Sequence, residues 1–347
     1  MIESTFIVEP FHPETASERD YDQVFQVESA AFALDMPEDP PTERSVVEGR
    51  IRVPQAEYGR CLYWACRYEG SIVGFGLVAL MPEENSHNAL VRIVVHPDFR
   101  RRGVGRQLLA EALPAIHAEG RTQVLGAGLK VGAPGAEWTV GLGFRETMRM
   151  VLLVIEPSMV ESALWDVSDA AGYRIERWQG HAPDDLVEAF ARARRAIEDV
   201  PHATGSYEHP DWDAGRVRKA EQELADRNVE QRVVVAVETD SGAIAAITEI
   251  MIFPHRKTWA YQGDTAVLSQ YRGNGLGRSV KAAMLRWLEE DGGQIGRIYT
   301  TTGVTNVHMI RINKEVGYHE VRTMIWCEAG VDELADRLGV AGPSTEN

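Results

Sequence analysis

The sequence predicts an α/β fold, an α+β mixed sheet present twice in two tandem domains, and three observations carry this prediction. The chain has 347 residues, about twice the usual size of one domain. Strand-like and helix-like segments follow one another in the same order in both halves. A glycine-rich motif, R-x-x-G-x-G, also occurs twice, in FRRRGVG (99–105) and in YRGNGLG (271–277).

Each half begins with a strand and a helix. The strands are FIVEP (6–10) and YRIERW (173–178). The helices carry apolar residues at helical spacing, namely Val24, Val27 and Ala31 in the first half and Leu186, Ala189, Phe190 and Ala193 in the second. A variable polar segment then precedes a predicted hairpin, at 62–80 and at 232–252, in which EG and SG supply the turns.

A further strand, the glycine-rich turn and a second helix come next, so the turn joins a strand to a helix. The apolar face of this helix is formed by Leu108, Leu109, Ala112 and Ile116 in the first half and by Val280, Ala283, Met284, Trp287 and Leu288 in the second. Later, GLGF (141–144) matches EVGY (315–318). We therefore expect an N-terminal domain at 1–156, a linker at 157–172, a C-terminal domain at 173–335 and a tail at 336–347.

Composition narrows the class of protein. A net charge of −16 opposes binding to nucleic acid and to anionic membranes, and it favours a cationic, amine-bearing small molecule. The N-terminus lacks the pattern of a signal peptide, and the longest aliphatic run, MVLLVI (150–155), is too short to span a bilayer, so we expect a cytoplasmic protein. Cys61, Cys66 and Cys327 lack metal-ligand spacing, and we expect core residues and no metal site.

The glycine-rich turns are candidate phosphate sites. A turn of this kind presents backbone N–H groups at a helix N-terminus, and a Cβ would keep an anion away from them. Basic residues surround each turn: Arg100, Arg101, Arg102 and Arg106 in the first half, and Arg272, Arg278 and Lys281 in the second. Neither turn has the third glycine of a dinucleotide fingerprint or the G-K-[ST] of a Walker loop.

These segments resemble a known family. VRIVVHPDFRRRGVGRQLLAEAL (91–113) is similar to the acyl-CoA-binding motif of the GNAT N-acetyltransferases, and DTAVLSQYRGNGLGRSVKAAMLRW (264–287) matches it without the proline. NVHMIRINKEVGY (306–318) approximates the later N-x-x-A-x-x-x-Y-x-x-x-G-F motif of the family. The resemblance covers most of both halves and implies a tandem GNAT protein that uses acetyl-CoA or another acyl-CoA.

The resemblance also implies positions for the acyl-CoA. In this family two strands splay apart beside the loop, and a main-chain N–H of the strand before it polarises the thioester carbonyl. The resemblance implies Ile93 for this role in the first half and Thr265 in the second. The residues implied for acyl-CoA binding are Ile93, Val95, Arg100, Arg101, Arg102, Gly103, Val104, Gly105 and Arg106, and Thr265, Val267, Arg272, Gly273, Asn274, Gly275, Leu276, Gly277, Arg278 and Asn306.

Two acids are candidates for the general base, which the family often takes from this region. Simple strand alternation puts Tyr261, Gly263 and Thr265 on one face and Asp264 on the other, which would turn Asp264 away from the thioester. Glu249 lies among apolar residues of the preceding strand, and a buried acid is costly unless it is paired or functional. The corresponding strand of the first half, NALVRIVV, has no acid, and Glu83, Glu84 and His87 lie in what we read as a solvated loop.

The family's general acid is in many members a tyrosine four positions before G-F. Asn313 occupies that position in the second half and Thr139 in the first, so the leaving thiolate takes its proton from water or from another tyrosine such as Tyr318 or Tyr261. The acceptor pocket is expected from 34–60 and 199–228. The second of these contains His202, Tyr207, His209, Asp211, Trp212 and Asp213, which suit an ammonium group or a packed surface equally well.

The sequence thus predicts an enzyme that transfers an acetyl group from acetyl-CoA to the amine of a small molecule. The second half is the more complete active site, with Glu249, Asp264, Tyr261 and Asn313 as candidate catalytic residues, and the first half is degenerate or a second CoA site. Two alternatives stay open: a CoA-binding regulatory or scaffold protein without turnover, and an enzyme whose catalytic half is the first. We expect a monomer or a homodimer, with no nucleic-acid or membrane partner.

Overall fold

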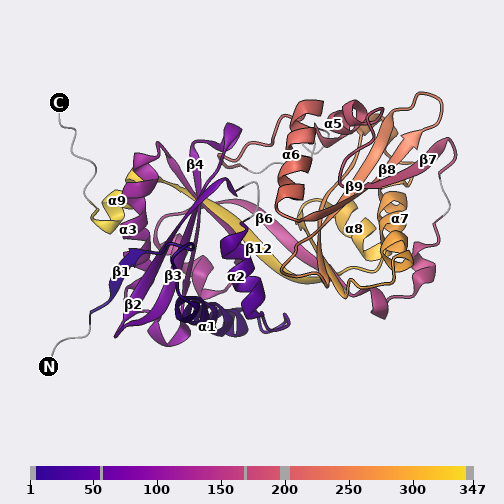
Figure 1. Cartoon of the computed structure of the whole chain (residues 1–347). Helices are drawn as coiled ribbons and strands as arrows, with labels where there is room; N and C mark the ends of the chain where they lie inside the picture. Colours follow the sequence, from indigo (N-terminus) through magenta and orange to yellow (C-terminus); the bar gives the residue numbers. More distant parts are fainter. Residues whose placement is uncertain (1–4, 55–57, 168–169, 196–203, 341–347) are drawn as a thin grey trace. The chain divides into compact units, whose positions relative to one another are not determined.

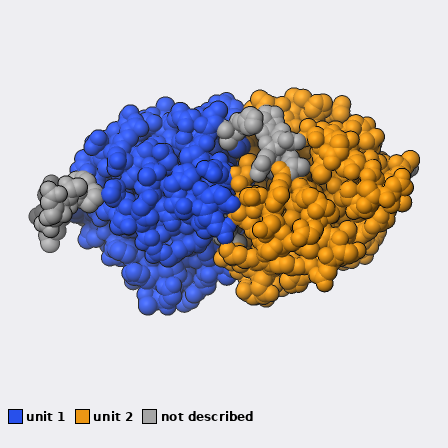
Figure 2. Space-filling view, turned by 90° about the horizontal axis from the view of Figure 1, so that it is seen from above, with its two compact units in different colours: residues 1–149, 203–208, 324–347 blue, residues 150–202, 209–323 orange. Residues whose placement is uncertain are grey.

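The computed structural model of the chain describes residues 5–54, 58–167, 170–195 and 204–340. The chain forms two compact units, which Figure 2 colours separately. Unit 1 consists of residues 1–149, 203–208 and 324–347, and unit 2 of residues 150–202 and 209–323. Each unit has its own set of strands and its own apolar core.

Unit 1 is a mixed sheet with helices on both faces. Its strands, in spatial order, are β1 (Ile7–Pro10), β2 (Arg60–Tyr68), β3 (Ser71–Leu80), β4 (Asn88–Val95), β5 (Gln123–Lys130) and the part of β12 (His319–Gly330) from Met324 onward. Helices α1 (Glu18–Asp35) and α2 (Arg44–Arg52) pack on one face, and α3 (Val104–Ala118) and α9 (Val331–Leu338) on the other (Figure 1). Helix α4 (Pro134–Gly141) follows β5.

Unit 2 repeats this plan. Its strands, in spatial order, are the part of β6 (Arg145–Ile155) from Met150 onward, β11 (Arg297–Gly303), β10 (Trp259–Val267), β9 (Ile244–Ile252), β8 (Glu230–Glu238) and β7 (Tyr173–Gln179). Helices α5 (Val187–Arg195) and α6 (Ala214–Asp226) pack on one face and α7 (Leu276–Glu290) on the other, and α8 (Val307–Glu315) follows β11. The repeated order of elements and the mixed sheet confirm the predicted fold class.

The last strand of each sequence half belongs to the sheet of the other unit. Strand β12 pairs antiparallel with β5, from Met324 opposite Lys130 to Gly330 opposite Gln123. Strand β6 pairs antiparallel with β11, from Ile298 opposite Ile155 to Gly303 opposite Met150. Pairing between strands so distant in sequence leaves no local signal, and the predicted domain boundaries stay a prediction.

The segment expected to be a linker is partly packed. Trp165 is 1% exposed in the core of unit 2, and its indole Nε1 donates a hydrogen bond to the Val316 carbonyl at 3.0 Å. Residues 168–169 of this segment and residues 341–347 of the expected tail lie outside the described residues. In the described part of the chain, no helix combines the length and the apolar character that a bilayer span requires.

Candidate functional site

The two glycine-rich turns have the same backbone conformation. In each turn the first glycine of the R-x-x-G-x-G motif is in the left-handed region and is the N-cap of the following helix. Gly103 has φ 88° and Gly275 has φ 73°. The residue two positions earlier is also left-handed: Gly273 has φ 86°, and Arg101 has φ 63° although it carries a Cβ. Because a side chain in this region costs on the order of 1 kcal/mol, unit 1 keeps the turn at some local strain.

Both turns leave open donors at a helix N-terminus. Helices α3 and α7 begin without a side-chain cap and without an acid in the first turn. A Cβ built at Gly103 or at Gly275 would meet no atom within 4 Å. Uncapped N–H groups, the helix dipole and free space beside them form an anion site of the size and charge of a phosphate. Both turns therefore fit the pyrophosphate of an acyl-CoA.

The first arginine of each turn braces the strand before it. Arg100 Nε donates to the Val95 carbonyl at 3.2 Å, and Arg272 Nε donates to the Val267 carbonyl at the same distance. Arg100 also binds Asp35 through both terminal nitrogens, at 2.8 and 2.7 Å. The guanidinium of unit 1 is thus engaged by a carboxylate of its own chain.

Two further arginines predicted to surround the turns bind main-chain carbonyls of the protein. Arg106 donates to the Arg337 carbonyl at 2.6 Å, and Arg278 donates to the Leu164 carbonyl at 3.4 Å. Lys281 does not surround the turn: it is 1% exposed and points into the core of unit 2. Assigning Lys281 to the loop was wrong because it lies on the buried face of α7.

In each unit the two central parallel strands separate close to the turn. Strand β4 pairs with β5 only from Asn88 to Leu90, and β10 pairs with β11 only from Trp259 to Tyr261. Beyond these residues the parallel ladder stops. This is the splayed arrangement that the family resemblance implied for both halves.

Only unit 2 has a β-bulge in the strand before the turn. Gln262 lies opposite Ile250 and Thr265 lies opposite Thr248, so β10 uses one more residue than β9 over this interval. In unit 1, β4 pairs with β3 in unbroken register throughout. A bulge leaves a residue outside the ladder and bends the strand, which frees main-chain polar groups next to the point of separation.

The bulge overturns the predicted facing of β10. The hydroxyl of Thr265 lies 2.8 Å from that of Thr248, on the α7 side of the sheet. Asp264 instead lies 3.9 Å from Arg194, the same guanidinium that binds Glu249. Alternation was wrong here because one extra residue reverses the face of every residue after it.

Glu249 and Asp264 form an acidic cluster with one arginine. Glu249 is 4% exposed and accepts hydrogen bonds from Arg194 at 3.3 Å and from Gln231 at 2.9 Å. The Arg194 guanidinium stacks on Trp212, with 3.6 Å from Cζ to the ring centroid. The Asp264 side chain is 40% exposed, so it is the acid of the pair that solvent reaches.

The matching place in unit 1 has the opposite charge. Arg92 lies on β4 where unit 2 has its bulge, and it binds the buried Glu28 of α1 at 2.5 and 3.1 Å. Arg50 adds a third hydrogen bond to Glu28 at 2.7 Å. Burial alone would raise the pKa of Glu28, but the two guanidiniums outweigh it and hold that pKa below its ordinary value. No pattern in the sequence indicates this cluster.

The position of the family's tyrosine differs between the units. Asn313 of unit 2 is 1% exposed, and neither its amide nitrogen nor its oxygen has a hydrogen-bond partner among the described residues. Thr139 of unit 1 is satisfied, because its hydroxyl donates to the Ala136 carbonyl at 2.9 Å. Asn306 caps α8 by accepting from the Met309 N–H at 3.1 Å, which gives this motif residue a structural role.

Sequence reasoning also missed a buried polar network behind the bulge. The Lys281 ammonium donates to Gln262 Oε1 at 2.7 Å, and the Tyr318 hydroxyl donates to the same oxygen at 2.6 Å. Gln262 Nε2 donates to the Thr248 hydroxyl at 2.9 Å, which in turn meets Thr265. Burial lowers the pKa of Lys281 to about 7 and raises that of Tyr318 well above its usual value, so Tyr318 is a poor proton donor. No local signal marks this network, because a lysine in a helix reads as a surface charge until the buried face of that helix is known.

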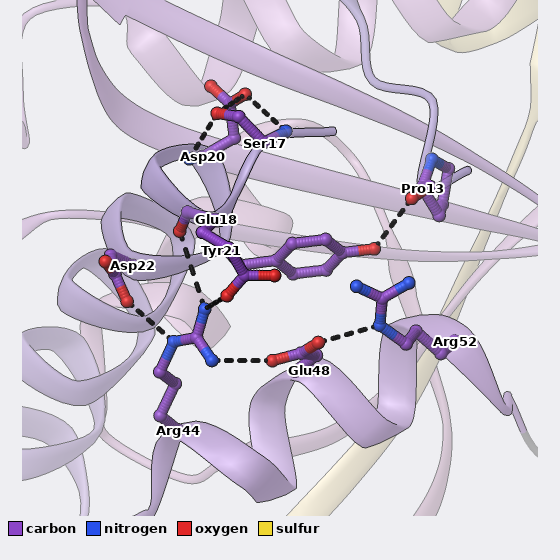
Figure 3. Close-up of polar contacts among 9 residues, drawn as sticks. All are labelled: Pro13, Ser17, Glu18, Asp20, Tyr21, Asp22, Arg44, Glu48 and Arg52. Atoms are coloured by element: carbon purple, nitrogen blue, oxygen red, sulfur yellow. Dashed lines mark hydrogen bonds and ion pairs between the residues drawn. The ribbon is translucent and has the colours of Figure 1, made fainter. Parts of the chain in front are cut away.

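The first expected acceptor segment, 34–60, contributes Arg44 and Glu48 to an ion network that joins α2 to α1 (Figure 3). Arg44 binds Glu18 at 2.5 Å, Asp22 at 2.6 Å and Glu48 at 2.8 Å. Exposed pairs of this kind contribute little stability each. They orient α2 on α1 and occupy the polar groups of this surface.

The second expected segment, 199–228, is divided between the units. Residues Thr204 to Glu208 bind unit 1, where Ser206 contacts Asn88 and His87, and Tyr207 stacks edge-on against Trp326. His87 thus packs against this segment, where the solvated-loop prediction was wrong, whereas Glu83 of the same loop is exposed as predicted. In unit 2, Trp212 supports Arg194, Asp213 caps α6 and Asp211 binds Arg195. His202 lies outside the described residues.

The described residues contain no cluster of three or more His, Cys, Asp or Glu side chains placed to hold a metal. Within the same ranges, Cys66 and Cys327 are buried and Cys61 is half-buried.

Comparison with known proteins agrees with this geometry. A family model described as "Acetyltransferase (GNAT) family" matches residues 24–128 and 195–318. A tandem GNAT protein from the clavulanic acid biosynthesis pathway, solved without AcCoA, has a TM-score of 0.75 at 21% identity, with 94% of this chain and 99% of that chain covered. A GCN5-related N-acetyltransferase from Sphaerobacter thermophilus has a TM-score of 0.68 at 15% identity, with 94% and 96% covered. No curated protein matches the sequence.

The buried lysine makes a testable contribution to stability. The unfolded chain keeps the ordinary lysine pKa near 10.5, so between pH 7 and 10.5 it binds more protons than the folded chain, and Lys281 destabilises the fold increasingly as the pH falls through this window. We expect Lys281→Met to be more stable than the wild type at pH 7, with a difference that shrinks by up to about 1.4 kcal/mol per pH unit as the pH rises to 9.5. Urea unfolding of both proteins at pH 6.5, 8.0 and 9.5 measures it, and a difference independent of pH would contradict the burial of a titrating amine.

Proposed function

The chain belongs to the acetyltransferase (GNAT) family, and on that premise we propose that unit 2 transfers an acetyl group from acetyl-CoA to the amine of a small cationic molecule. The observation that carries the proposal is the β10 bulge. Asp264 lies within this bulge, Glu249 lies on the neighbouring strand β9, and β10 leads from the bulge into the turn that begins α7. Unit 1 has the turn and the splayed strands, but at the matching point it has Arg92 in a regular ladder.

Charge supports unit 2 as the amine site. Glu249, Asp264 and Arg194 sum to −1 (−2 + 1), whereas Glu28, Arg92 and Arg50 in unit 1 sum to +1 (−1 + 2). An ammonium group is attracted to the first cluster and repelled by the second. The net charge of −16 adds a long-range field of the same sign.

Acetyl-CoA supplies the acyl group as an activated thioester, and the residues of this chain supply position and a proton acceptor. The turn from Arg272 to Gly277 would hold the pyrophosphate through main-chain N–H groups. Main-chain donors of the bulge would hold the thioester oxygen, where they stabilise developing negative charge. Asp264, reachable from solvent, would take the proton of the attacking amine, directly or through water, as the nitrogen bonds to the acyl carbon. The C–S bond then breaks, and the CoA thiolate leaves and takes a proton from water. Glu249 would hold Arg194 beside Asp264. Tyr261 and Asn313 stay candidates on the family resemblance alone.

A charge placed in each turn separates the two CoA sites. We expect Gly275→Asp to weaken acetyl-CoA binding at least about tenfold, because the carboxylate would occupy open space in the phosphate cradle. Gly275→Asn is the matched control, since asparagine tolerates a left-handed backbone equally well without the charge. The same pair at Gly103 tests unit 1, which has the same φ sign and the same free space.

Isothermal titration calorimetry with acetyl-CoA measures the affinity of the wild type and of the aspartate and asparagine variants. If acetyl-CoA affinity falls in the aspartate variants and not in the asparagine variants, the result supports binding of the pyrophosphate by the turn. An equal loss with asparagine would assign the effect to backbone shape, and the absence of binding by the wild type would refute the proposed function.

The proton acceptor can be tested on the exposed acid. We expect Asp264→Asn to lower kcat about 100-fold or more with a panel of primary amines, since general-base catalysis contributes on the order of 10² to 10⁴. Asp240→Asn, at an exposed acid in the β8–β9 turn, is the control. Free thiol released from acetyl-CoA measures the rate. Full activity in Asp264→Asn would move the role to Glu249, tested by Glu249→Gln with folding checked by circular dichroism, since that change leaves Arg194 without its carboxylate.

A further inference from the structure

The buried network of Lys281, Gln262, Tyr318, Thr248 and Thr265 surrounds the β10 bulge from the α7 side. Gln262 is the last residue in register before the bulge and Thr265 the first after it, and Thr248 links the two at 2.9 and 2.8 Å. The Thr300 hydroxyl donates to the Gln262 carbonyl at 3.0 Å, which ties the same peptide to β11. Both ends of the bulge are thus held by side chains as well as by the ladder.

Unit 1 shows what the fold builds without this network. The cross-strand pair Gly76 and Ile93 of unit 1 occupies the positions that Thr248 and Thr265 occupy in unit 2. Val91 takes the place of Gln262. Leu109 takes the place of Lys281, nine residues after the loop arginine, and Phe144 that of Tyr318, one residue after the shared glycine. Gly76 has no side chain, the other four residues are apolar and pack in one cluster under α3, and β4 has no bulge.

The network is expensive to maintain. Lys281 is 1% exposed, and its hydrogen-bond partner is the neutral Gln262 amide, with no carboxylate paired to it among the described residues. Burying an ammonium without a counter-charge lowers stability. A leucine at the matching position of unit 1 is 1% exposed in a well-packed core, so the architecture itself does not require the lysine.

We propose that this network is a positioning device that holds the β10 bulge in the shape needed for acyl transfer in unit 2. The inference rests on the proposed function, because it concerns the main-chain donors assigned there to the thioester oxygen. Gln262 is the central residue: its side-chain oxygen accepts from Lys281 and Tyr318, and its nitrogen reaches across to Thr248. None of the five side chains is assigned contact with the acyl group.

The first test measures the bulge directly in the free protein. Amide ¹H–¹⁵N resonances of Gly263 and Asp264, from selectively labelled full-length chain, report its geometry. We expect Lys281→Met and Gln262→Leu to shift both resonances. Gln262→Glu should keep the wild-type pattern, because a carboxylate still accepts from Lys281 and Tyr318 and the Thr248 hydroxyl can then donate to it. Leu109→Met, at the matching place in unit 1, is the control and should leave both resonances unchanged.

The second test measures the consequence for the ligand. Titrations with acetyl-CoA and with CoA are made in the Gly103→Asp background, so that the turn of unit 2 is the site observed. We expect Lys281→Met, Gln262→Leu and the isosteric Thr265→Val to reduce the preference for acetyl-CoA over CoA by about fivefold, the effect of one hydrogen bond. Gln262→Glu should retain the preference. Lys281→Met is the sharpest case, because it should stabilise the chain while impairing its ligand preference.

The outcomes separate this inference from the proposed function. If the wild type binds acetyl-CoA but the variants keep both amide resonances and the ligand preference, the network is a packing feature only and this inference is overturned. If the wild type binds neither ligand, the proposed function fails, and the positioning role fails with it even where the resonances shift. If Gln262→Leu does not fold, Thr265→Val decides, because it removes one hydroxyl without changing the shape of the side chain.

Discussion

One extra residue in β10 determines how the groups of the candidate site are distributed. Before the bulge, β10 and β9 are in ordinary antiparallel register, and after it every side chain changes face. The change brings Asp264 to the side of Glu249 and Arg194, and it sends Thr265 to the side of Lys281 and α7. It also takes main-chain groups out of the ladder at the place where β10 and β11 separate. The acids, the network and the free donors are all consequences of the same irregularity.

The two units share the backbone geometry of the turn but differ in the side chains buried behind it. Both keep the left-handed turn, the uncapped helix N-terminus and the early end of the central parallel ladder. These features are properties of the backbone, and glycine and one strained arginine are sufficient to maintain them. The buried side chains against the strand differ: they form an apolar cluster in one unit and a hydrogen-bonded network in the other. Unit 1 has the first solution and unit 2 the second.

Sequence patterns predicted the elements whose signals are local. The 3.6-residue spacing of apolar groups located the four main helices, and the repeated R-x-x-G-x-G located both turns. Three features have no such signal. The pairing of β12 with β5 and of β6 with β11 is decided by strands far apart in sequence. The bulge adds one residue without an unusual sequence, and Gly263 is compatible with either register. Lys281 reads as a surface charge until the face of α7 that carries it is known to be buried.

The two units also differ in the net charge of the cluster beside the strand that precedes the turn. A shared guanidinium between two carboxylates leaves unit 2 with an excess of negative charge, and its more exposed carboxylate is the one on the bulge. Two guanidiniums on one buried carboxylate leave unit 1 with an excess of positive charge at the same point of the fold. An amine that attacks the thioester can pass its proton to the first arrangement as the C–N bond forms, whereas the second holds its only acid in three charge-assisted hydrogen bonds that lower its basicity. Two copies of one CoA-binding plan therefore differ where the acceptor would react, and this difference, more than the turns that first marked the repeat, distinguishes the proposed catalytic unit.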